Sequence, residues 1–578
     1  MAGLRQPGRA GAGPPLALPA HHPPLLLHAR HHDGAPRPDR VRAAGLSPAL
    51  PDPRAGLRGH ARGAVPRTAG LSPASDAARA APRSPAARLL GRPDHGGGEE
   101  DARVSGGAAR RGPVVVLGGG VAGLAAGYYL ARGGFSVTVV ERAPVVGGLC
   151  GSFQAHGFTL DHGPHKLYSV VPGILDEIRA LLGDRLIEHR KRNRVRLLGR
   201  FMDYPLTLGN LMPLLGPARA AGLGLSYAAA AAGGILDGTE PRTYEDYVVR
   251  RFGRGVYELV FEPLARKVWG DPSQLSADLA RARIPSGGAA ELILRLLGLK
   301  ETTENEDAPF FYYPRGGFGV FPQRLAEEIA KAGGTVVTSA APVGLEREGA
   351  RVRAVMVEQD GARRRLEAET VVSSIPLSAL SGLLFPGDAA VAEETRQLRL
   401  RDLALVFLVL RQEKVTDDHW IFFPERRYPF NRMFEQKSMD PGLGPADRAA
   451  VCCDLTCDAG DEVWSAPDDA LVRRCLDALV ETGLTTPDRF EAGSVRRFRS
   501  FYPMYTVDYR ERVGRVYERL RAADNLVLTG RLGMFNYNNS DHCLDMGRFI
   551  ASGMGEGRTP RQVWAGLEER VRTYRIID

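Results

Sequence analysis

Cysteine is scarce in this chain of 578 residues: six are present, and no two of them are spaced as Cys-x-x-Cys. Cys452, Cys453 and Cys457 form a close group, but no histidine lies near them in the sequence. A disulfide framework and a tetrahedral zinc site both need cysteine patterns that this sequence does not have. We therefore expect reduced thiols, no metal site and a cytoplasmic location.

Long apolar runs are also missing. The uncharged apolar stretch at residues 220–236 is rich in Ala and Gly and is shorter than the roughly 20 apolar residues that a membrane-spanning helix needs. We expect a buried helix there and no membrane partner. The N-terminal region has no apolar run followed by a small-residue cleavage site, so a secretory signal is not indicated.

The positive charge is confined to one region. The formal net charge is +9, yet residues 1–112 alone carry 17 Arg and 8 acidic residues, which leaves 59 basic and 59 acidic residues in the remainder. The first region is rich in Pro, Ala, Arg, Gly and His without helical or strand periodicity, so it cannot bury enough apolar surface to offset its chain entropy. We expect residues 1–112 to be a disordered basic tail, and the neutral remainder gives no reason to expect a nucleic-acid partner.

A glycine-rich turn follows this tail. Residues 114–117 and 136–140 are short β-branched segments typical of buried strands, and the small residues between them favour a helix. Gly118, Gly120 and Gly123 form Gly-x-Gly-x-x-Gly at the start of that helix. The first glycine permits the tight turn, the second lets the backbone approach a pyrophosphate, and the third lets helix and strand pack closely. The pattern predicts a Rossmann-type dinucleotide site.

An acidic residue completes the motif. Glu141 ends the second strand, 23 residues after Gly118, where a carboxylate accepts hydrogen bonds from the adenosine ribose hydroxyls. The segment that follows, Gly147-Gly148-Leu149, resembles the double-glycine motif that follows the acid in FAD-binding oxidoreductases. We therefore predict FAD as the cofactor.

Further segments in the same order resemble the flavin amine oxidase superfamily, which includes protoporphyrinogen oxidase, monoamine oxidases and UDP-galactopyranose mutase. They include GFTLDHGPHKLYS at 157–169, YPRGGFGVFPQRLAEEI at 313–329 and NLVLTGRLGMFNYNNSDHCLDMGRF at 525–549. The likeness covers nearly all of residues 113–560. It implies FAD contacts at Gly118, Gly120, Val121, Ala122, Gly123, Glu141, Arg142, Gly148, Leu149, Gly163, Pro164, His165, Val343, Gly530, Arg531, Asn539 and Asp541.

The predicted fold class is α/β, with a Rossmann-type FAD-binding domain, a helical insertion and a β-sheet domain on the substrate side. We expect the FAD-binding domain to be discontinuous, assembled from 113–168, 308–375 and 525–578. Helical spacing favours an insertion over 169–307, and alternating segments favour the sheet domain over 376–524.

Two enzyme classes would use the flavin differently. In an FAD-dependent oxidoreductase, which we expect, the flavin accepts a hydride from a small organic substrate. In the alternative, a reduced-flavin nucleotide-sugar mutase, the flavin attacks an anomeric carbon. Gly287 and Leu264 stand where the mutases have a diphosphate-binding arginine and a base-stacking tyrosine, which disfavours a nucleotide sugar. A noncatalytic flavin-binding protein is the third possibility.

The resemblance also implies a set of catalytic residues. They are His165, Arg401, Tyr502, Tyr537 and Asp541. The identity of the substrate and the oligomeric state do not follow from the sequence.

Overall fold

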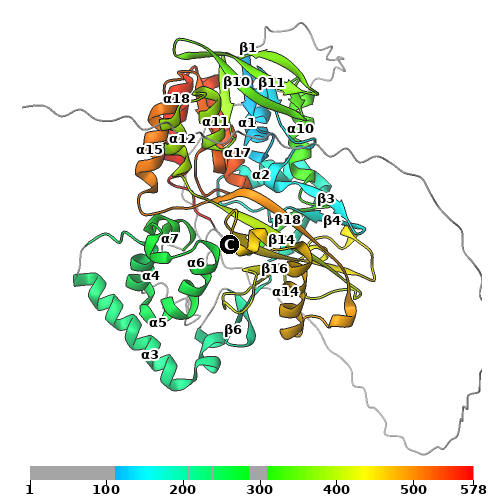
Figure 1. Cartoon of the computed structure of the whole chain (residues 1–578), viewed down its shortest axis with the longest axis vertical. Helices are drawn as coiled ribbons and strands as arrows, with labels where there is room; N and C mark the ends of the chain where they lie inside the picture. The colour runs from blue at the N-terminus through cyan, green and yellow to red at the C-terminus, as the bar shows by residue number, and fades with distance from the viewer. Residues whose placement is uncertain (1–110, 205–207, 237–238, 285–308, 577–578) are drawn as a thin grey trace, which may run out of the picture. The chain divides into compact units, whose positions relative to one another are not determined.

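The computed structural model describes residues 111–204, 208–236, 239–284 and 309–576. A parallel sheet of five strands has the order β19-β13-β1-β2-β9. Figure 1 labels its central strand, β1, and the helix that follows it, α1 (Val121–Arg132). The strands of this sheet come from three separate stretches of the chain, so contacts between distant segments complete the sheet. The strands are β1 (Arg111–Leu117), β2 (Phe135–Val140), β9 (Thr335–Val337), β13 (Thr370–Ser373) and β19 (Leu526–Leu528).

The central strand, β1, begins earlier than predicted. Arg111 and Gly112, which we assigned to the tail, belong to this strand. The Arg111 backbone N–H donates to the Gly134 carbonyl at 3.0 Å, and its guanidinium lies 5.2 Å from the Phe135 ring centroid. Arg and Gly carry little strand preference, so only the pairing with β2 reveals that they are part of the sheet. The rest of the predicted tail lies outside the described residues.

Helices α1 (Val121–Arg132) and α17 (Ser540–Gly555) pack against each other through small residues. A Cβ atom on Gly547 would lie 2.6 Å from the Ala125 carbonyl carbon, so a larger residue would force the helices apart. On another side of α1, a Cβ atom on Gly127 would lie 3.1 Å from Ile329 in α10 (Val320–Lys331). This close packing fixes α1 under the sheet and α17 beside α1.

A second sheet has seven strands in the order β18-β14-β17-β16-β15-β6-β7. Two of its strands fall within residues 169–307, where we predicted a helical insertion, so that prediction is wrong for these residues. The alternation of buried Val195 and Leu197 with arginines is a strand pattern that the high arginine content obscures. The strands are β6 (Asn193–Leu197), β7 (Arg200–Tyr204), β14 (Leu400–Leu410), β15 (Trp420–Phe422), β16 (Arg432–Glu435), β17 (Ala449–Cys457) and β18 (Phe490–Pro503).

Three smaller sheets complete the strand pairing of the described residues. The strands of an antiparallel three-stranded sheet are β10 (Ala340–Glu348), β11 (Arg351–Gln359) and β12 (Ala362–Glu367). Two antiparallel pairs join β3 (Ser152–Ala155) to β4 (Phe158–Asp161), and β5 (Leu186–Arg190) to β8 (Phe310–Pro314). β5 is a third strand within the stretch predicted to be helical.

The helices within residues 169–307 are otherwise where the spacing predicts them. They are α2 (Ile174–Leu182), α3 (Leu208–Leu236), α4 (Tyr244–Phe252), α5 (Arg254–Val256), α6 (Glu262–Val268) and α7 (Ala277–Arg283). The other helices are α11 (Leu377–Leu384), α12 (Ala389–Arg396), α13 (Glu462–Ser465), α14 (Asp468–Glu481), α15 (Tyr509–Leu520), α16 (Gly530–Gly533) and α18 (Pro560–Val571).

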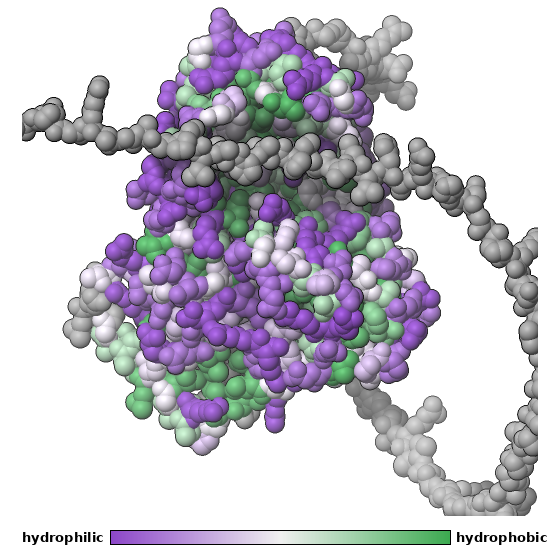
Figure 2. Space-filling model, viewed as in Figure 1, coloured by the Kyte–Doolittle hydropathy of each residue, from purple (hydrophilic) through white to green (hydrophobic). Residues whose placement is uncertain are grey.

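Helix α3 contains the apolar stretch 220–236, but the prediction that this helix is buried is wrong. Leu225 is 73% exposed, and most of the described side chains around it are exposed or half-buried. Figure 2 shows hydrophobic residues at the surface in the part of the view where α3 lies. Alanine and glycine bury little area, so an apolar composition of this kind does not force a helix into a core. In the described part of the chain, no helix has the length and apolarity needed to cross a membrane.

Candidate functional site

The turn between β1 and α1 forms an open cradle of backbone. Gly118 has φ +99°, and a Cβ atom on Gly123 would lie 1.9 Å from the Gly118 carbonyl oxygen, so both positions require glycine. A Cβ atom on Gly120, by contrast, would have no neighbour within 4 Å. The first turn of α1 has no side-chain cap, so its backbone N–H groups are available to an anion. A pyrophosphate fits this cradle.

The double-glycine segment lies directly beside that turn. The Gly147 N–H donates to the Gly119 carbonyl at 2.8 Å, and a Cβ atom on Gly148 would lie 3.3 Å from the Gly120 Cα atom. Leu149 is half-buried in the same segment. The two glycine motifs therefore form one continuous backbone surface.

Glu141 is fixed at the end of β2. Its carboxylate accepts hydrogen bonds from the backbone N–H groups of Gly119 at 2.7 Å and Ala143 at 2.8 Å. Arg142 is exposed, and Val343 on β10 is 41% exposed although it is apolar. A carboxylate held beside the cradle fits the ribose of an adenosine. The individual contacts of Glu141, Arg142 and Val343 with it stay predictions.

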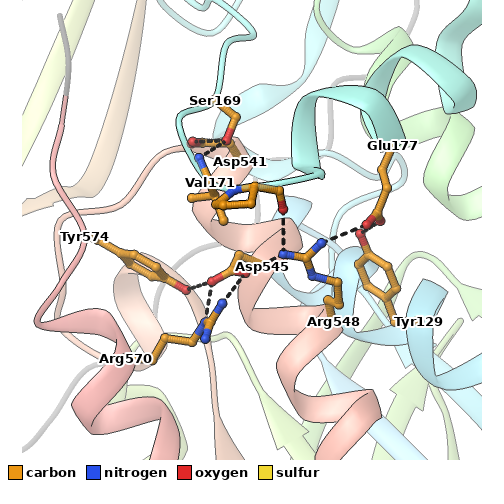
Figure 3. A network of polar contacts seen from close by, with 10 residues as sticks. Tyr129, Ser169, Val171, Glu177, Asp541, Asp545, Arg548, Arg570 and Tyr574 are labelled. Atoms are coloured by element: carbon orange, nitrogen blue, oxygen red, sulfur yellow. Dashed lines mark hydrogen bonds and ion pairs between the residues drawn. The ribbon is translucent and has the colours of Figure 1, made fainter. Parts of the chain in front are cut away.

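The segment 163–169 and the start of α17 come together opposite the cradle. The Ser169 hydroxyl donates to Asp541 at 2.9 Å (Figure 3). The Asn539 side-chain amide donates to the Tyr168 hydroxyl at 3.0 Å. Arg531 donates to the Asn538 carbonyl at 2.9 Å. The structure thus places the predicted site residues Asn539 and Asp541 against a segment that lies more than 350 positions earlier in the sequence.

Gly530 joins this region to α1. Its φ is +77°, and a Cβ atom there would lie 2.5 Å from the Ala122 Cβ atom. The turn before α17 therefore touches the first turn of α1, next to Val121. The predicted residues Gly530, Val121 and Ala122 form one packed junction beneath the cradle.

His165 is held as a neutral imidazole. Its ring stacks on Phe318 with centroids 4.6 Å apart, and its buried Nδ1 atom has no hydrogen-bond partner among the described residues. Burial, together with the positive charges of Arg531 and Arg432 and the neighbouring His162, lowers the pKa of His165 to about 3. An uncharged buried ring with an unsatisfied nitrogen is a suitable hydrogen-bond partner for a bound ring system. Gly163 and Pro164 direct the chain toward this position.

Three aromatic residues and two arginines form what we call the Tyr537 cluster: Trp269, Arg283, Tyr502, Arg531 and Tyr537. The Trp269 indole N–H donates to the Tyr537 hydroxyl at 2.8 Å, and the Tyr502 ring lies nearly parallel to that of Tyr537 at 6.1 Å. The Arg531 guanidinium is 5.3 Å from the Tyr502 centroid. The Arg283 guanidinium is 5.0 Å from Trp269 and 5.6 Å from Tyr537.

Arg531 brings a positive charge to this cluster. Burial raises the pKa of Tyr537, so its hydroxyl stays protonated, and Arg283 and Arg531 are the charged residues that act most strongly on it. No ion pair links Arg531 to a carboxylate anywhere in the described chain. Two guanidinium groups beside flat aromatic surfaces suit an anionic ligand with a ring or an unsaturated body.

The guanidinium of Arg401, which we predict to be catalytic, is held by other groups of the protein. Its Nη1 atom contacts Asp458 at 2.7 Å and its Nε atom donates to the Val268 carbonyl at 3.2 Å, while its side chain is only 11% exposed. A guanidinium with these partners holds the turn before Trp269, so we interpret Arg401 as a positioning residue. Leu264 lies in α6, on the same segment, and Gly287 lies outside the described residues.

Lys267 and Arg283 are not among the site residues that the resemblance implies. Lys267 opens a Lys-x-Trp-Gly segment, residues 267–270. Its ammonium contacts backbone carbonyl oxygens, so charge pairing along the sequence gives no signal for it. The Lys-x-Trp-Gly spacing itself is the one feature that could have indicated Lys267.

Comparison with known proteins agrees with this geometry. The sequence model of the flavin containing amine oxidoreductase family matches residues 121–531. Phytoene dehydrogenase of Streptomyces griseus is 26% identical over 277 residues, which are 43% of this chain and 52% of that protein. Human protoporphyrinogen oxidase is 30% identical over 314 residues, which are 48% of this chain and 62% of that protein. The matched region thus spans between half and two thirds of each of these relatives.

Solved structures show the same fold. A reduced UDP-galactopyranose mutase has a TM-score of 0.67 at 18% identity, and the match covers 80% of this chain and 99% of that one. A putrescine oxidase variant has a TM-score of 0.54 at 15% identity, with 77% and 99% covered. The predicted α/β fold and FAD as the cofactor are confirmed.

Proposed function

Because this chain belongs to the flavin containing amine oxidoreductase family, we propose that it is an FAD-dependent oxidoreductase that oxidises an anionic organic substrate held by the Tyr537 cluster. The single observation that supports this substrate class is the placement of Arg283 and Arg531 on the faces of Trp269, Tyr537 and Tyr502. A substrate with a flat body and carboxylate groups satisfies both features, since the rings stack and the carboxylates pair with the arginines.

The same observation disfavours two other substrate classes. An amine is a cation at neutral pH, and Arg531, which forms no ion pair with a carboxylate in the described chain, would repel it. A hydrocarbon polyene would leave the buried polar groups of the cluster without partners, which costs free energy. Among the relatives, the protoporphyrinogen and coproporphyrinogen oxidases have names that fit a carboxylate-bearing substrate.

FAD, when bound, supplies an acceptor for a hydride. The chain would hold its pyrophosphate with the turn that contains Gly120, its ribose with Glu141 and its ring system with the segments around His165 and Asn539. Tyr537 and Trp269 are 3% and 5% exposed, so the cluster excludes water from the face of the substrate that they contact. The Trp269 N–H occupies a lone pair of the Tyr537 oxygen and leaves the Tyr537 proton directed elsewhere.

A redox-neutral nucleotide-sugar mutase is the second candidate. The presence of Trp269 beside two arginines favours it, because a diphosphate pairs with guanidinium groups as well as a carboxylate does. Leu264 disfavours it, because an aliphatic side chain offers no stacking partner to a nucleobase at that position.

Spectral titration of the FAD-loaded protein would distinguish the candidates. We expect coproporphyrinogen to bleach the oxidised flavin without air, and putrescine to leave it unchanged. Bleaching by putrescine alone would overturn the anionic substrate. Binding of UDP-galactose only after dithionite reduction, without net oxidation, would favour the mutase. A flavin that responds to none of these compounds would favour a noncatalytic protein.

A further inference from the structure

The short turn that carries Trp269 is attached to the seven-stranded sheet through its preceding residue. The Lys267 ammonium donates three hydrogen bonds to backbone carbonyl oxygens of the segment between β15 and β16. The acceptors are Phe423 at 2.6 Å, Glu425 at 2.8 Å and Phe430 at 2.8 Å. Every N–H of the ammonium therefore has a partner.

The backbone of the same turn is held as well. The Thr456 hydroxyl on β17 donates to the Lys267 carbonyl at 2.8 Å, and Arg401 on β14 donates to the Val268 carbonyl at 3.2 Å. The next residue is Trp269, whose indole N–H reaches Tyr537. Three consecutive residues thus connect the sheet to the aromatic surface of the site.

We propose that Lys267 is a positioning residue that holds the Trp269 indole against Tyr537 and so maintains the substrate surface of the cluster. This inference rests on the proposed function in one respect, namely that the Tyr537 cluster is the substrate site. The geometry favours lysine because an ammonium has three N–H donors and no acceptor, which matches three converging carbonyl oxygens. A neutral amine has only two donors and would turn its lone pair toward the third carbonyl.

This arrangement responds to pH near neutrality. Burial lowers the pKa of Lys267 to about 7, against the opposing effects of Asp454 and Glu425. Asp454 is itself paired with Arg432 at 2.7 Å, and Glu425 with Arg427 at 2.7 Å, so neither carboxylate is committed to Lys267 alone. Loss of the proton would loosen the attachment of the Trp269 turn.

The test follows the accessibility of Trp269 in the full-length, FAD-loaded protein. The chain has four tryptophans, so acrylamide quenching is measured from pH 5.5 to 8.5 with and without W269F in each background. We expect the Trp269 signal of the wild type to become more quenchable with a midpoint near pH 7. Lys267→Arg should remove this transition because guanidinium stays charged, and Lys267→Met should show the high-pH level throughout.

Two results would overturn the inference: a transition in Lys267→Arg equal to that of the wild type, or quenching in Lys267→Met equal to that of the wild type at pH 5.5. If Lys267→Met does not retain FAD, the comparison of Lys267→Arg with the wild type decides alone. A normal pH transition combined with no flavin response to coproporphyrinogen would contradict the proposed function and still support the positioning of Trp269.

Discussion

Two clusters of charged and aromatic residues flank α17, and they differ in how completely their charges are matched. The Asp545 carboxylate is 0% exposed and accepts hydrogen bonds from Arg570 at 2.5 and 2.7 Å, Tyr574 at 2.6 Å and Arg548 at 3.1 Å (Figure 3). Arg531, in the Tyr537 cluster, contacts a carbonyl oxygen and an aromatic ring but no carboxylate among the described residues. A buried carboxylate whose hydrogen-bond partners are all supplied by the protein stabilises the fold. An arginine without a carboxylate partner can still bind an anionic ligand.

The largest expected effect comes from removing the Asp545 carboxylate from its cluster. Asp545→Ala would remove the four hydrogen bonds that this buried carboxylate accepts and would leave Arg548 with Glu177 as its remaining carboxylate partner, which costs about 3–5 kcal/mol of unfolding free energy. Urea unfolding of the FAD-loaded protein measures this. Asp176→Ala is the matched control, because Asp176 and Arg179 form an exposed ion pair with side chains 80% and 48% exposed, and its loss should cost less than about 1 kcal/mol. Equal losses of unfolding free energy in Asp545→Ala and Asp176→Ala would contradict the stabilising role of the Asp545 cluster.

The next effect concerns ligand affinity rather than stability. Arg531→Met should weaken coproporphyrinogen binding by about 1.5–3 kcal/mol, or roughly 10- to 100-fold, because a charge-assisted contact is lost. Its unfolding free energy should change little. Arg548→Met, in the Asp545 cluster, should do the reverse: lower stability and leave the spectral titration unchanged. Comparable affinities for Arg531→Met and the wild type would remove the proposed anionic site.

These two clusters also show how far the sequence could predict the site. Gly118, Gly120 and Glu141 lie in one local motif whose spacing specifies strand, turn and helix, so the pattern alone indicated the cofactor. The network around Asp545 extends from α17 and α18 to α2 and α1, because Arg548 also donates to Glu177, which accepts a hydrogen bond from Tyr129. No local pattern reveals such long-range pairing. The contacts of Lys267 go to backbone carbonyls about 160 residues away, and a carbonyl belongs to every residue type.

The errors have physical causes of the same kind. The strand β6 was hidden because arginines can occupy the exposed positions of a strand as readily as those of a helix. The burial of α3 was predicted from composition, although Ala and Gly gain little from burial. For Arg401 the resemblance implies a catalytic role, and only the fold shows that its guanidinium contacts Asp458 and the Val268 carbonyl.

The stability of the protein in acid gives a third test, with a smaller expected effect, of the role of the Asp545 carboxylate. Burial by itself raises the pKa of Asp545, but hydrogen bonds from Arg570 and Tyr574 outweigh it and hold that pKa below its usual value. The stabilisation is therefore fully present above the unfolded pKa, near 3.9, and is lost as the pH falls through the folded pKa. The melting temperature should fall on acidification in the wild type and in Arg531→Met, and more gently in Asp545→Asn. An unchanged acid dependence in Asp545→Asn would contradict this role of Asp545.

The smallest expected effect isolates a single hydrogen bond. Trp269→Phe keeps an aromatic ring and removes the N–H that donates to Tyr537, so binding of coproporphyrinogen should weaken by about 1 kcal/mol, or roughly fivefold. Trp564→Phe is the control, because the Trp564 indole nitrogen is buried without a hydrogen-bond partner among the described residues, and its removal should leave binding unchanged. Spectral titrations of both variants measure the difference. A larger loss in Trp269→Phe than in Arg531→Met would mean that the aromatic surface, rather than the unmatched charge, contributes most of the affinity.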